Sequence, residues 1–374
     1  MSVVIKEVQT KKDLKKWVEF PNKLYKKVDA YVPFLVSDEI ATFTESQNPA
    51  YEYAETKLFL AYIDNKIVGR IGGIINHAAN KKWNQNRLRF TRFDFIDNFS
   101  VSKALFDAVV GWGKQYGYTE IIGPIGFHDM DHEGMLIEGF DELNMSITFY
   151  NFPYYIDHMV KLGLKKEVDW VEFQLKVPEK PNEKIKKLTE FLMKRSNVEL
   201  VRYTDRKTLY EDAFKAFAVV DEAFSVLYGT VPLTDKVIKK SIDDYIPLVN
   251  LKYVTVVKDK GEIIGFALMV PSIAKAVKKS NGKLFPLGAL RVLRALKGKN
   301  DTLEMFLVAI KPEYQSKGIP VMLINDMLET CIKNGVKYCE TGPELEDNKN
   351  VQSLWRNFDD VRQHKRRRCW IKEI

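Results

Sequence analysis

The chain has 374 residues, of which 45% are hydrophobic, and a formal net charge of +8. This length is large for one domain and suits two, and the hydrophobic content can fill a core in each. There is no apolar run of about eighteen residues and no apolar block typical of a signal peptide, so we expect a soluble, cytoplasmic protein. The three cysteines lack CxxC spacing, which argues against a disulfide framework and indicates reduced core thiols.

The first half of the chain predicts strand, helix, hairpin, strand, helix and strand in that order. Apolar alternation marks the strands, a three-to-four-residue period marks the helices, and Ser100 is a suitable N-cap for the second helix. The expected elements are a strand Val3–Val8, a helix from Lys11, a hairpin Leu58–Ile63 and Ile67–Ile75, a strand Leu88–Ile96, a helix from Ser100 to Tyr116, and a strand Thr119–Phe127.

The second half repeats this order after a proline-rich linker, Val177–Asn182. We therefore predict a duplicated α/β protein with domains at residues 1–176 and 183–374. The expected elements are a strand Val198–Tyr203, helices Lys207–Leu227 and Thr234–Ile246, a hairpin Lys252–Val257 and Ile263–Val270, a strand Met305–Ile310, a helix from Val321, and a final strand near Cys369–Ile374.

One turn in the second half has the features of a phosphate-binding site. The strand Met305–Ile310 is ended by Lys311-Pro312, because proline lacks a ladder donor, and the turn 315–318 then leads into the helix from Val321. Free amides and the positive end of the helix dipole attract anions at such a terminus, and Gly318 lets the backbone approach a ligand closely. The alternative is an ordinary turn before a core helix.

This segment resembles the cofactor-binding core of the GNAT acyltransferases, in which a valine, a proline and a Gln-x-x-Gly turn hold acyl-CoA. Val308, Gln315 and Gly318 match that pattern. Pro320 replaces the usual glycine or alanine, and Trp355 replaces the usual tyrosine, which is the family's general acid. The resemblance implies a mixed, mostly antiparallel sheet flanked by helices in each half, and acetyl-CoA or another acyl-CoA as cofactor. The cofactor-binding residues that it implies are Val308, Ile310, Gln315, Ser316, Lys317, Gly318, Ile319 and Asn348.

Most of the chain is similar to an uncharacterised family of tandem GNAT-like proteins. The residues that carry this resemblance are Gly123-Pro124, the segment Gly134–Asp141 and the run Tyr150–Tyr155. The first half lacks Gln-x-x-Gly after its fourth strand, and Asp97 there would compete with a phosphate for the helix terminus. We therefore expect one acyl-CoA site, in the second half.

Candidate catalytic groups lie in the first half. The loop 128–133 carries His128 and Glu133, either of which can take a proton from an ammonium, and a solvated acidic loop is the alternative. Its His-x-x-x-His spacing would suit a metal only on a helix, so no metal is predicted. Tyr154 and Tyr155 begin a helix where the second half has Trp355, which suggests a hydroxyl donor; aromatic packing is the alternative.

The net charge is concentrated in Lys275–Lys299, which holds eight basic residues and no acid, so the remainder of the chain has no net charge. Within it, Pro286–Lys297 predicts an amphipathic helix. Three interpretations remain: contact with an anionic membrane, a clamp for the 3′-phosphate of CoA, or a surface helix whose leucines cover the core. A neutral remainder makes nucleic-acid binding unlikely.

The predicted function is N-acyl transfer, most simply acetyl transfer, from acyl-CoA to an amine. One alternative is N-acylation of a lipid amine by a long-chain acyl-CoA, which the basic leucine helix favours. Another is a non-catalytic binding protein with the GNAT fold, which Pro320 and Trp355 favour. A transfer reaction that depends on tRNA is a third alternative, against which the neutral remainder argues.

Overall fold

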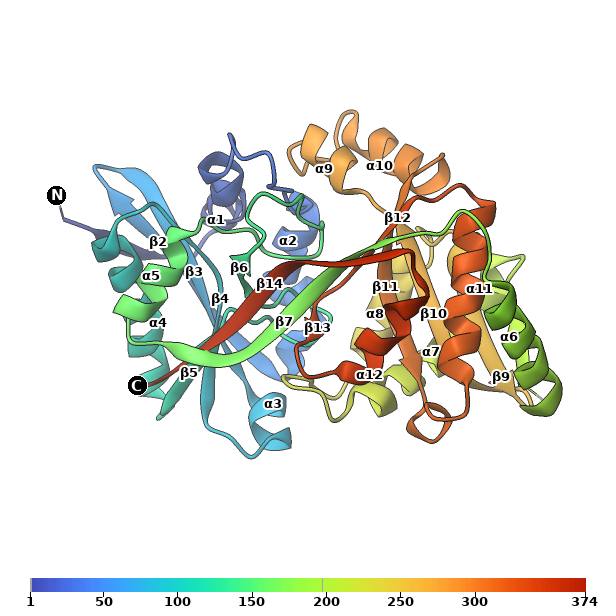
Figure 1. Ribbon diagram of the computed structural model, residues 1–374. Coiled ribbons are helices and arrows are strands. Elements are labelled where there is room, and N and C mark those ends of the chain that lie inside the picture. The colour runs from blue at the N-terminus through green and yellow to red at the C-terminus, as the bar shows by residue number, and fades with distance from the viewer. Residues whose placement is uncertain (1, 197) are drawn as a thin grey trace. The chain divides into compact units, whose positions relative to one another are not determined.

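The computed structural model describes residues 2–196 and 198–374, and they form two compact units (Figure 1). Unit 1 contains Met1–Trp170, Ala274–Arg291 and Lys365–Ile374, and unit 2 contains Val171–Ile273 and Val292–His364. The domain boundary that the sequence predicts at 177–182 stays a prediction. No described helix has both the length and the apolarity needed to cross a bilayer.

Unit 1 is built on a mixed sheet in the order β1-β2-β3-β4-β5-β14, with β6 paired to β14. Only the β4–β5 pair is parallel, and the other pairs are antiparallel. The strands are β1 Val4–Glu7, β2 Ala54–Ile63, β3 Lys66–Asn76, β4 Arg87–Phe95, β5 Glu120–Gly123, β6 Met135–Glu138 and β14 Asp360–Glu373, whose last residues belong to this unit.

Helices cover both faces of this sheet because its strands alternate. Phe59 and Ala61 of β2 pack under α4 and α5, whereas Leu58 and Leu60 pack under α1 on the opposite face. The helices of unit 1 are α1 Lys11–Leu24, α2 Val36–Thr42, α3 His77–Lys82, α4 Phe99–Gln115, α5 Tyr154–Lys161 and α9 Ala274–Lys279, with 3-10 turns η1 Glu45–Gln47 and η2 Pro49–Glu52.

Unit 2 repeats the topology in the order β8-β9-β10-β11-β12-β7, and again only one pair, β11–β12, is parallel. The duplicated architecture predicted from the sequence is therefore confirmed. Its strands are β7 Lys165–Lys176, which begins in unit 1, β8 Val198–Val201, β9 Val254–Asp259, β10 Glu262–Pro271, β11 Thr302–Ile310, β12 Tyr338–Thr341 and β13 Glu344–Leu345.

The sheet of unit 2 is also covered on both faces. Helix α11 packs on one face against Val257 and Ile264, and α7 packs on the other against Val256 and Phe266. The remaining elements are α6 Glu183–Ser196, α7 Arg206–Phe224, α8 Asp235–Tyr245, η3 Leu251–Tyr253, α10 Gly288–Lys297, which begins in unit 1, η4 Pro312–Tyr314, α11 Ile319–Lys333, α12 Lys349–Gln352 and η5 Ser353–Asn357.

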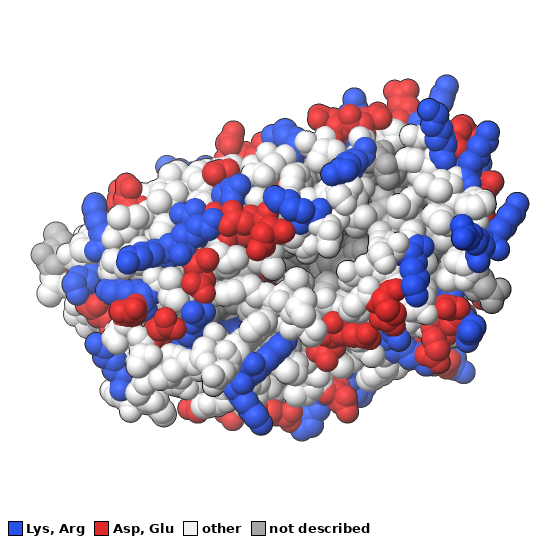
Figure 2. Space-filling model, turned by 60° about the horizontal axis from the view of Figure 1, so that its bottom comes forward, with Lys and Arg blue, Asp and Glu red and all other residues white. Residues whose placement is uncertain are grey.

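The last strand is longer than predicted and explains the basic run 364–368. Arg367 is fully buried, and its guanidinium donates to the Phe149 carbonyl and to Asn144 Oδ1 at 2.7 Å. Arg368 Nε donates to Asp169 Oδ1 at 2.7 Å. These side chains hold β14 in unit 1, so the run is a structural element and not a surface cluster. Acidic and basic side chains are interspersed on the face of the molecule shown in Figure 2.

Two local predictions differ from the structure. Helix α4 begins at Phe99, because Asn98 Oδ1 accepts from the Ser100 amide and serves as the N-cap in place of Ser100. Strand β5 ends at Gly123 and does not run to Phe127, since the following Pro124 cannot donate to the ladder.

Candidate functional site

The strand that precedes the predicted phosphate turn is open along one edge. β11 pairs with β12 only from Thr302 to Met305, and beyond that point no strand pairs with this edge among the described residues. The other edge stays paired with β10 up to Ile310. The Lys311 amide donates to the Ile264 carbonyl of β10 at 2.9 Å, so by alternation the amides of Val308 and Ile310 face the open edge.

A β-bulge lies where this edge opens. The register of β10 against β11 shifts between Leu268 and Met269, so Phe306 of β11 has no residue directly opposite. A bulge bends the strand that carries it and redirects its polar groups. Together, the bulge and the missing partner leave a short segment with free backbone donors, which can orient a carbonyl group.

The turn after β11 presents free amides at the start of α11. Gly318 is the N-cap, with φ +80°, and Pro320 lies in the first turn of the helix. Among the backbone hydrogen bonds of the described residues, the amides of Gly318, Ile319 and Val321 donate none. Three donors at the positive end of a fifteen-residue helix suit a phosphate, although Pro320 removes a fourth.

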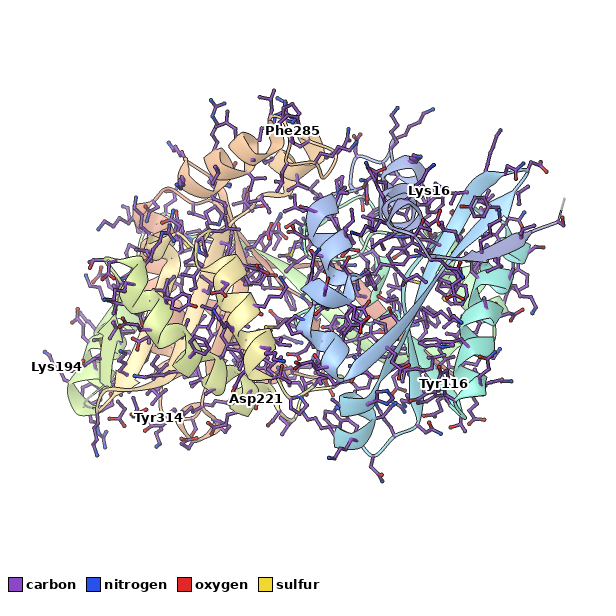
Figure 3. All side chains as sticks on the ribbon, turned by 180° about the vertical axis from the view of Figure 1, so that it is seen from behind. Lys16, Tyr116, Lys194, Asp221, Phe285 and Tyr314 are labelled. Atoms are coloured by element: carbon purple, nitrogen blue, oxygen red, sulfur yellow. The ribbon has the colours of Figure 1, made fainter. Side chains whose placement is uncertain are left out.

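Other predicted cofactor residues have mixed roles. Gln315 Nε2 donates to the Ile310 carbonyl at 3.1 Å and so fixes the turn to the end of β11. Lys317 is exposed, and its ammonium lies 4.4 Å from the centroid of the Tyr314 ring, whose position Figure 3 shows. Asn348 Oδ1 caps α12 by accepting from the Val351 amide. Ser316 is exposed in the middle of the turn.

Gly318 also touches a helix that precedes the sheet. A Cβ placed on Gly318 would lie 2.8 Å from Leu192 Cδ1 of α6, which is closer than carbon atoms tolerate. The positive φ disfavours a side chain as well. Substitution of Gly318 therefore perturbs helix packing together with any ligand site, and Ser316 is the cleaner position at which to test the turn.

The structure reveals one acidic group in unit 2 that the sequence analysis missed. Glu344 lies three residues beyond the end of β12, and Trp355 Nε1 donates to its carboxylate, at 3.0 Å from Oε1 and 3.2 Å from Oε2. Trp355 itself is buried. The sequence contains a weak indication of this residue, since an acid follows β12, the strand parallel to β11. Acidic residues after strands are common, however, and nothing in the sequence indicates the contact with Trp355.

The carboxyl group of Glu344 has a pKa that suits proton transfer near neutral pH. Burial raises the pKa of Glu344 to about 8, and the negative charge of Glu172 adds to this effect. Hydrogen bonds from Trp355 and Thr341 oppose it. The residue is nevertheless partly exposed. A partly exposed carboxyl group with a pKa near the ambient pH can act as a general base.

In unit 1 the bulge of β4 carries a buried ionic cluster. Arg92 of β4 is fully buried with φ +45°, at a bulge opposite Ile71. Its Nη2 donates to Glu39 Oε1 at 2.9 Å and to Asp131 Oδ1 at 2.7 Å. The guanidinium holds the pKa of the Asp131 carboxyl well below its usual range, against the opposing effect of burial. This ionic cluster lies at the bulge of β4, whereas the bulge of β11 carries Phe306.

The tyrosines proposed as hydroxyl donors pack within unit 1. The Tyr155 hydroxyl accepts from the Phe95 amide at 2.8 Å and lies 2.7 Å from the Tyr25 hydroxyl. Tyr154 donates to the Phe95 carbonyl at 2.5 Å. Burial raises the pKa of both phenols above the ordinary tyrosine value. Their catalytic role stays a prediction, and these contacts fix α5 to β4.

His128 and Glu133 lie together in the loop that follows β5. Burial raises the pKa of Glu133 well above the ordinary value, with a further contribution from Asp129, and burial lowers the pKa of His128. His128 Nδ1 accepts from the Met130 amide at 3.2 Å, which closes the loop. Their role as bases stays a prediction.

The predicted site residues therefore belong to different units. All the predicted cofactor residues lie in unit 2, together with Glu344, and the predicted catalytic residues lie in unit 1. Among the described residues, no cluster of three or more His, Cys, Asp or Glu side chains could hold a metal ion.

Comparison with known proteins shows which proteins this arrangement is similar to. Residues 221–359, which include β9 to β12 and Glu344, match the model of the Acetyltransferase (GNAT) family. The chain is 25% identical over 377 residues to Protein YghO of Escherichia coli, covering 99% of this chain and 95% of that one. It is 23% identical over 362 residues to a bacterial ceramide synthase of Caulobacter vibrioides, covering 94% and 92%.

A solved structure shares the complete fold. It is a tandem GNAT protein from the clavulanic acid biosynthesis pathway, with a TM-score of 0.56 and 10% identity, and the match covers 100% of this chain and 98% of that one. The two-unit GNAT-like fold predicted from the sequence is confirmed.

Proposed function

We propose that this chain transfers an acyl group from acyl-CoA to an amine, with the cofactor in unit 2 and Glu344 as the general base. The match of residues 221–359 to the GNAT family model and the likeness of the whole chain to a tandem GNAT structure support this proposal. The observation that carries the proposal is the coincidence, in one unit, of an open strand edge, free helix-terminal amides and a carboxyl group of raised pKa. The GNAT-family match covers all three.

The proposed reaction is direct aminolysis of the thioester. The amides of Val308 and Ile310 orient the thioester carbonyl and stabilise the negative charge that develops on its oxygen. Glu344 takes a proton from the ammonium form of the acceptor, and the neutral nitrogen attacks the carbonyl carbon. A C–N bond forms, the C–S bond breaks, and CoA leaves as a thiolate. The thiolate takes up the second proton that the attacking nitrogen loses as the amide forms, so CoA is released as the thiol.

Binding of the cofactor can be tested before the acceptor is known. Acyl-CoA thioesters of increasing chain length should raise the melting temperature by different amounts, because a ligand that binds only the folded state stabilises it according to its affinity. The best donor is then incubated with a panel of primary amines, and amide and free CoA are measured by mass spectrometry. Equimolar amide and CoA support the proposal; absence of any thermal shift with every thioester contradicts it.

A lipid amine is the second candidate acceptor. The relative from Caulobacter vibrioides is named a ceramide synthase, and a ceramide is the N-acyl derivative of a long-chain amino alcohol. By extension, the present chain would join a long acyl group to a lipid amine. A larger thermal shift with long-chain than with acetyl thioesters favours this acceptor class, and the reverse order favours small amines.

A binding protein without catalysis remains the contrasting hypothesis, which the residues Pro320 and Trp355 favour. Pro320 removes one amide, and Trp355 cannot supply an acidic hydroxyl. This hypothesis predicts cofactor binding without turnover for every acceptor tested, or no cofactor binding. The proposal requires both binding and turnover, so the same two measurements separate the hypotheses.

A further inference from the structure

The segment of α9 and α10 exposes an apolar surface that the packing of the protein does not require. Phe285 is 89% exposed, Leu287 54%, Leu290 47% and Leu293 40%. Figure 3 shows Phe285 at the outer side of this segment. The sequence allowed an interpretation in which these leucines cover the core, but only the opposite side of α10, with Val292 and Leu296, is buried.

The exposed residues are held in a fixed position. Within unit 1, the Val36 amide donates to the carbonyl of Gly282, three residues before Phe285, at 2.9 Å. Arg291 Nη1 donates to the Lys279 carbonyl and to Ser280 Oγ, each at 3.2 Å. These bonds tie the start of α10 back to the end of α9. The apolar side chains are thus presented from a folded segment.

Basic side chains surround this apolar surface. Within the part of the chain that the structure describes, Lys278 Nζ lies 3.5 Å from Asp29 Oδ1, and Lys283 Nζ lies 3.9 Å from Glu19 Oε1. These two ion pairs neutralise two of the eight positive charges between residues 275 and 299. The remaining lysines and arginines of the segment form no ion pair there, and no acid lies between residues 275 and 299. The residues that keep an uncompensated charge are Lys275, Lys279, Arg291, Arg294, Lys297 and Lys299.

We propose that this segment, with Phe285, Leu287, Leu290 and Leu293, is a peripheral docking surface for an anionic lipid bilayer. Phe285 and the three leucines can enter the layer between the lipid head groups and the acyl chains, while the lysines and arginines contact the phosphate groups. Binding of this kind depends on both the apolar and the basic side chains. An anionic bilayer offers both an apolar interior for the exposed aromatic residue and phosphate charges for the bases. A protein partner is an outcome that the experiment below can reveal. The proposal stands independently of acyl transfer.

The experiment is cosedimentation of the full chain with vesicles of phosphatidylcholine alone and of phosphatidylcholine mixed with phosphatidylglycerol. The chain should bind only the anionic vesicles, and binding should weaken as salt is raised, because the basic groups act through screened charges. The double variant Phe285→Ser/Leu290→Ser should reduce binding about tenfold or more. Val226→Ser, which changes an apolar residue that is 80% exposed elsewhere, is the matched control and should bind normally.

A second pair of variants tests the charges. Arg294→Glu/Lys297→Glu should abolish binding to anionic vesicles, whereas Lys186→Glu/Lys187→Glu in α6, which changes net charge equally, should leave most of it. Circular dichroism verifies folding of each variant. Equal binding of the Phe285→Ser/Leu290→Ser variant and the unaltered chain would overturn the proposal. Equal binding to neutral vesicles, or self-association that the same variant abolishes in sedimentation equilibrium, would also overturn it.

Discussion

The indole Nε1 of Trp355 lies 3.0 Å from Oε1 of Glu344, within a region of unit 2 where the indole is buried and the carboxyl group is partly exposed. Trp355, which stands where the GNAT pattern has a tyrosine, therefore contacts an acidic side chain directly. It donates a hydrogen bond to the ionised carboxylate and so opposes the effect of burial on the pKa of Glu344. In the proposed mechanism, Glu344 is the base and Trp355 positions it.

Trp355→Phe removes the hydrogen-bond donor while keeping an aromatic ring. The ionised form of Glu344 loses stabilisation, so its pKa should rise further and the acidic limb of the pH–rate profile should move to higher pH. The packing loss should lower the melting temperature only modestly. An acidic limb at the same pH as in the unaltered chain would show that the indole does not change the pKa of this carboxyl group.

Glu344→Gln removes the proposed base but keeps an acceptor for the indole. Turnover should fall by about 10²- to 10⁴-fold, the usual contribution of a general base, while CoA affinity stays the same. The acidic limb near pH 8 should disappear. Glu346→Gln, two residues further along, is the matched control. Loss of turnover in both variants would indicate a general effect of charge and not a base.

Glu344→Gln should also change how the free energy of unfolding depends on pH. The pKa of Glu344 is about 8 in the folded state and near the ordinary 4.5 when unfolded, so the unfolded state binds fewer protons between these values. Stability of the unaltered chain therefore falls as pH rises through this window. Relative to it, Glu344→Gln should gain stability from pH 4.5 to 8, on the order of a few kcal/mol at most. Urea unfolding at several pH values measures the difference; a constant offset would contradict the raised pKa.

Gly318→Ala tests the contact between the turn and α6. The positive φ costs about 1 kcal/mol for a residue with a side chain, and the added methyl group lies against Leu192. In a cycle with Leu192→Ala, the double variant should be more stable than the sum of the single effects predicts, because the shortened side chain makes room. Strict additivity in urea unfolding would mean that the two residues do not touch.

The order of elements could be predicted, because it depends on local patterns. Apolar alternation located β2, β3 and β9, and the amphipathic period located α11. The exchange of the last strand between the two halves of the chain could not be predicted. Trp370–Glu373, at the end of the second half, pair with β5 in unit 1, and Gln174–Lys176, at the end of the first half, pair with β12 in unit 2. Both strands follow a helix and carry similar patterns, so the choice of partner depends on contacts distant in sequence.

The residues of the candidate site also differ in how far the sequence alone predicts them. The residues of the turn Gln315–Gly318 are contiguous, so the sequence alone predicts a turn with free amides there. Glu344 depends on burial and on a tryptophan eleven residues away, and neither property is visible in a single sequence. The role of Leu192 was also hidden, since it lies on a helix that comes before the whole sheet of unit 2.

The most direct test of the central claim is calorimetric titration of CoA into the chain and two variants of the exposed Ser316. Ser316→Asp places a negative charge in the turn without reducing helix stability, since an acid near a helix N-terminus is favourable, and Ser316→Asn is its neutral match. Acyl-CoA binding in unit 2 predicts an affinity at least about tenfold weaker for Ser316→Asp and nearly unchanged for Ser316→Asn. Equal affinity of all three proteins for CoA, or no binding by the unaltered chain, would contradict it.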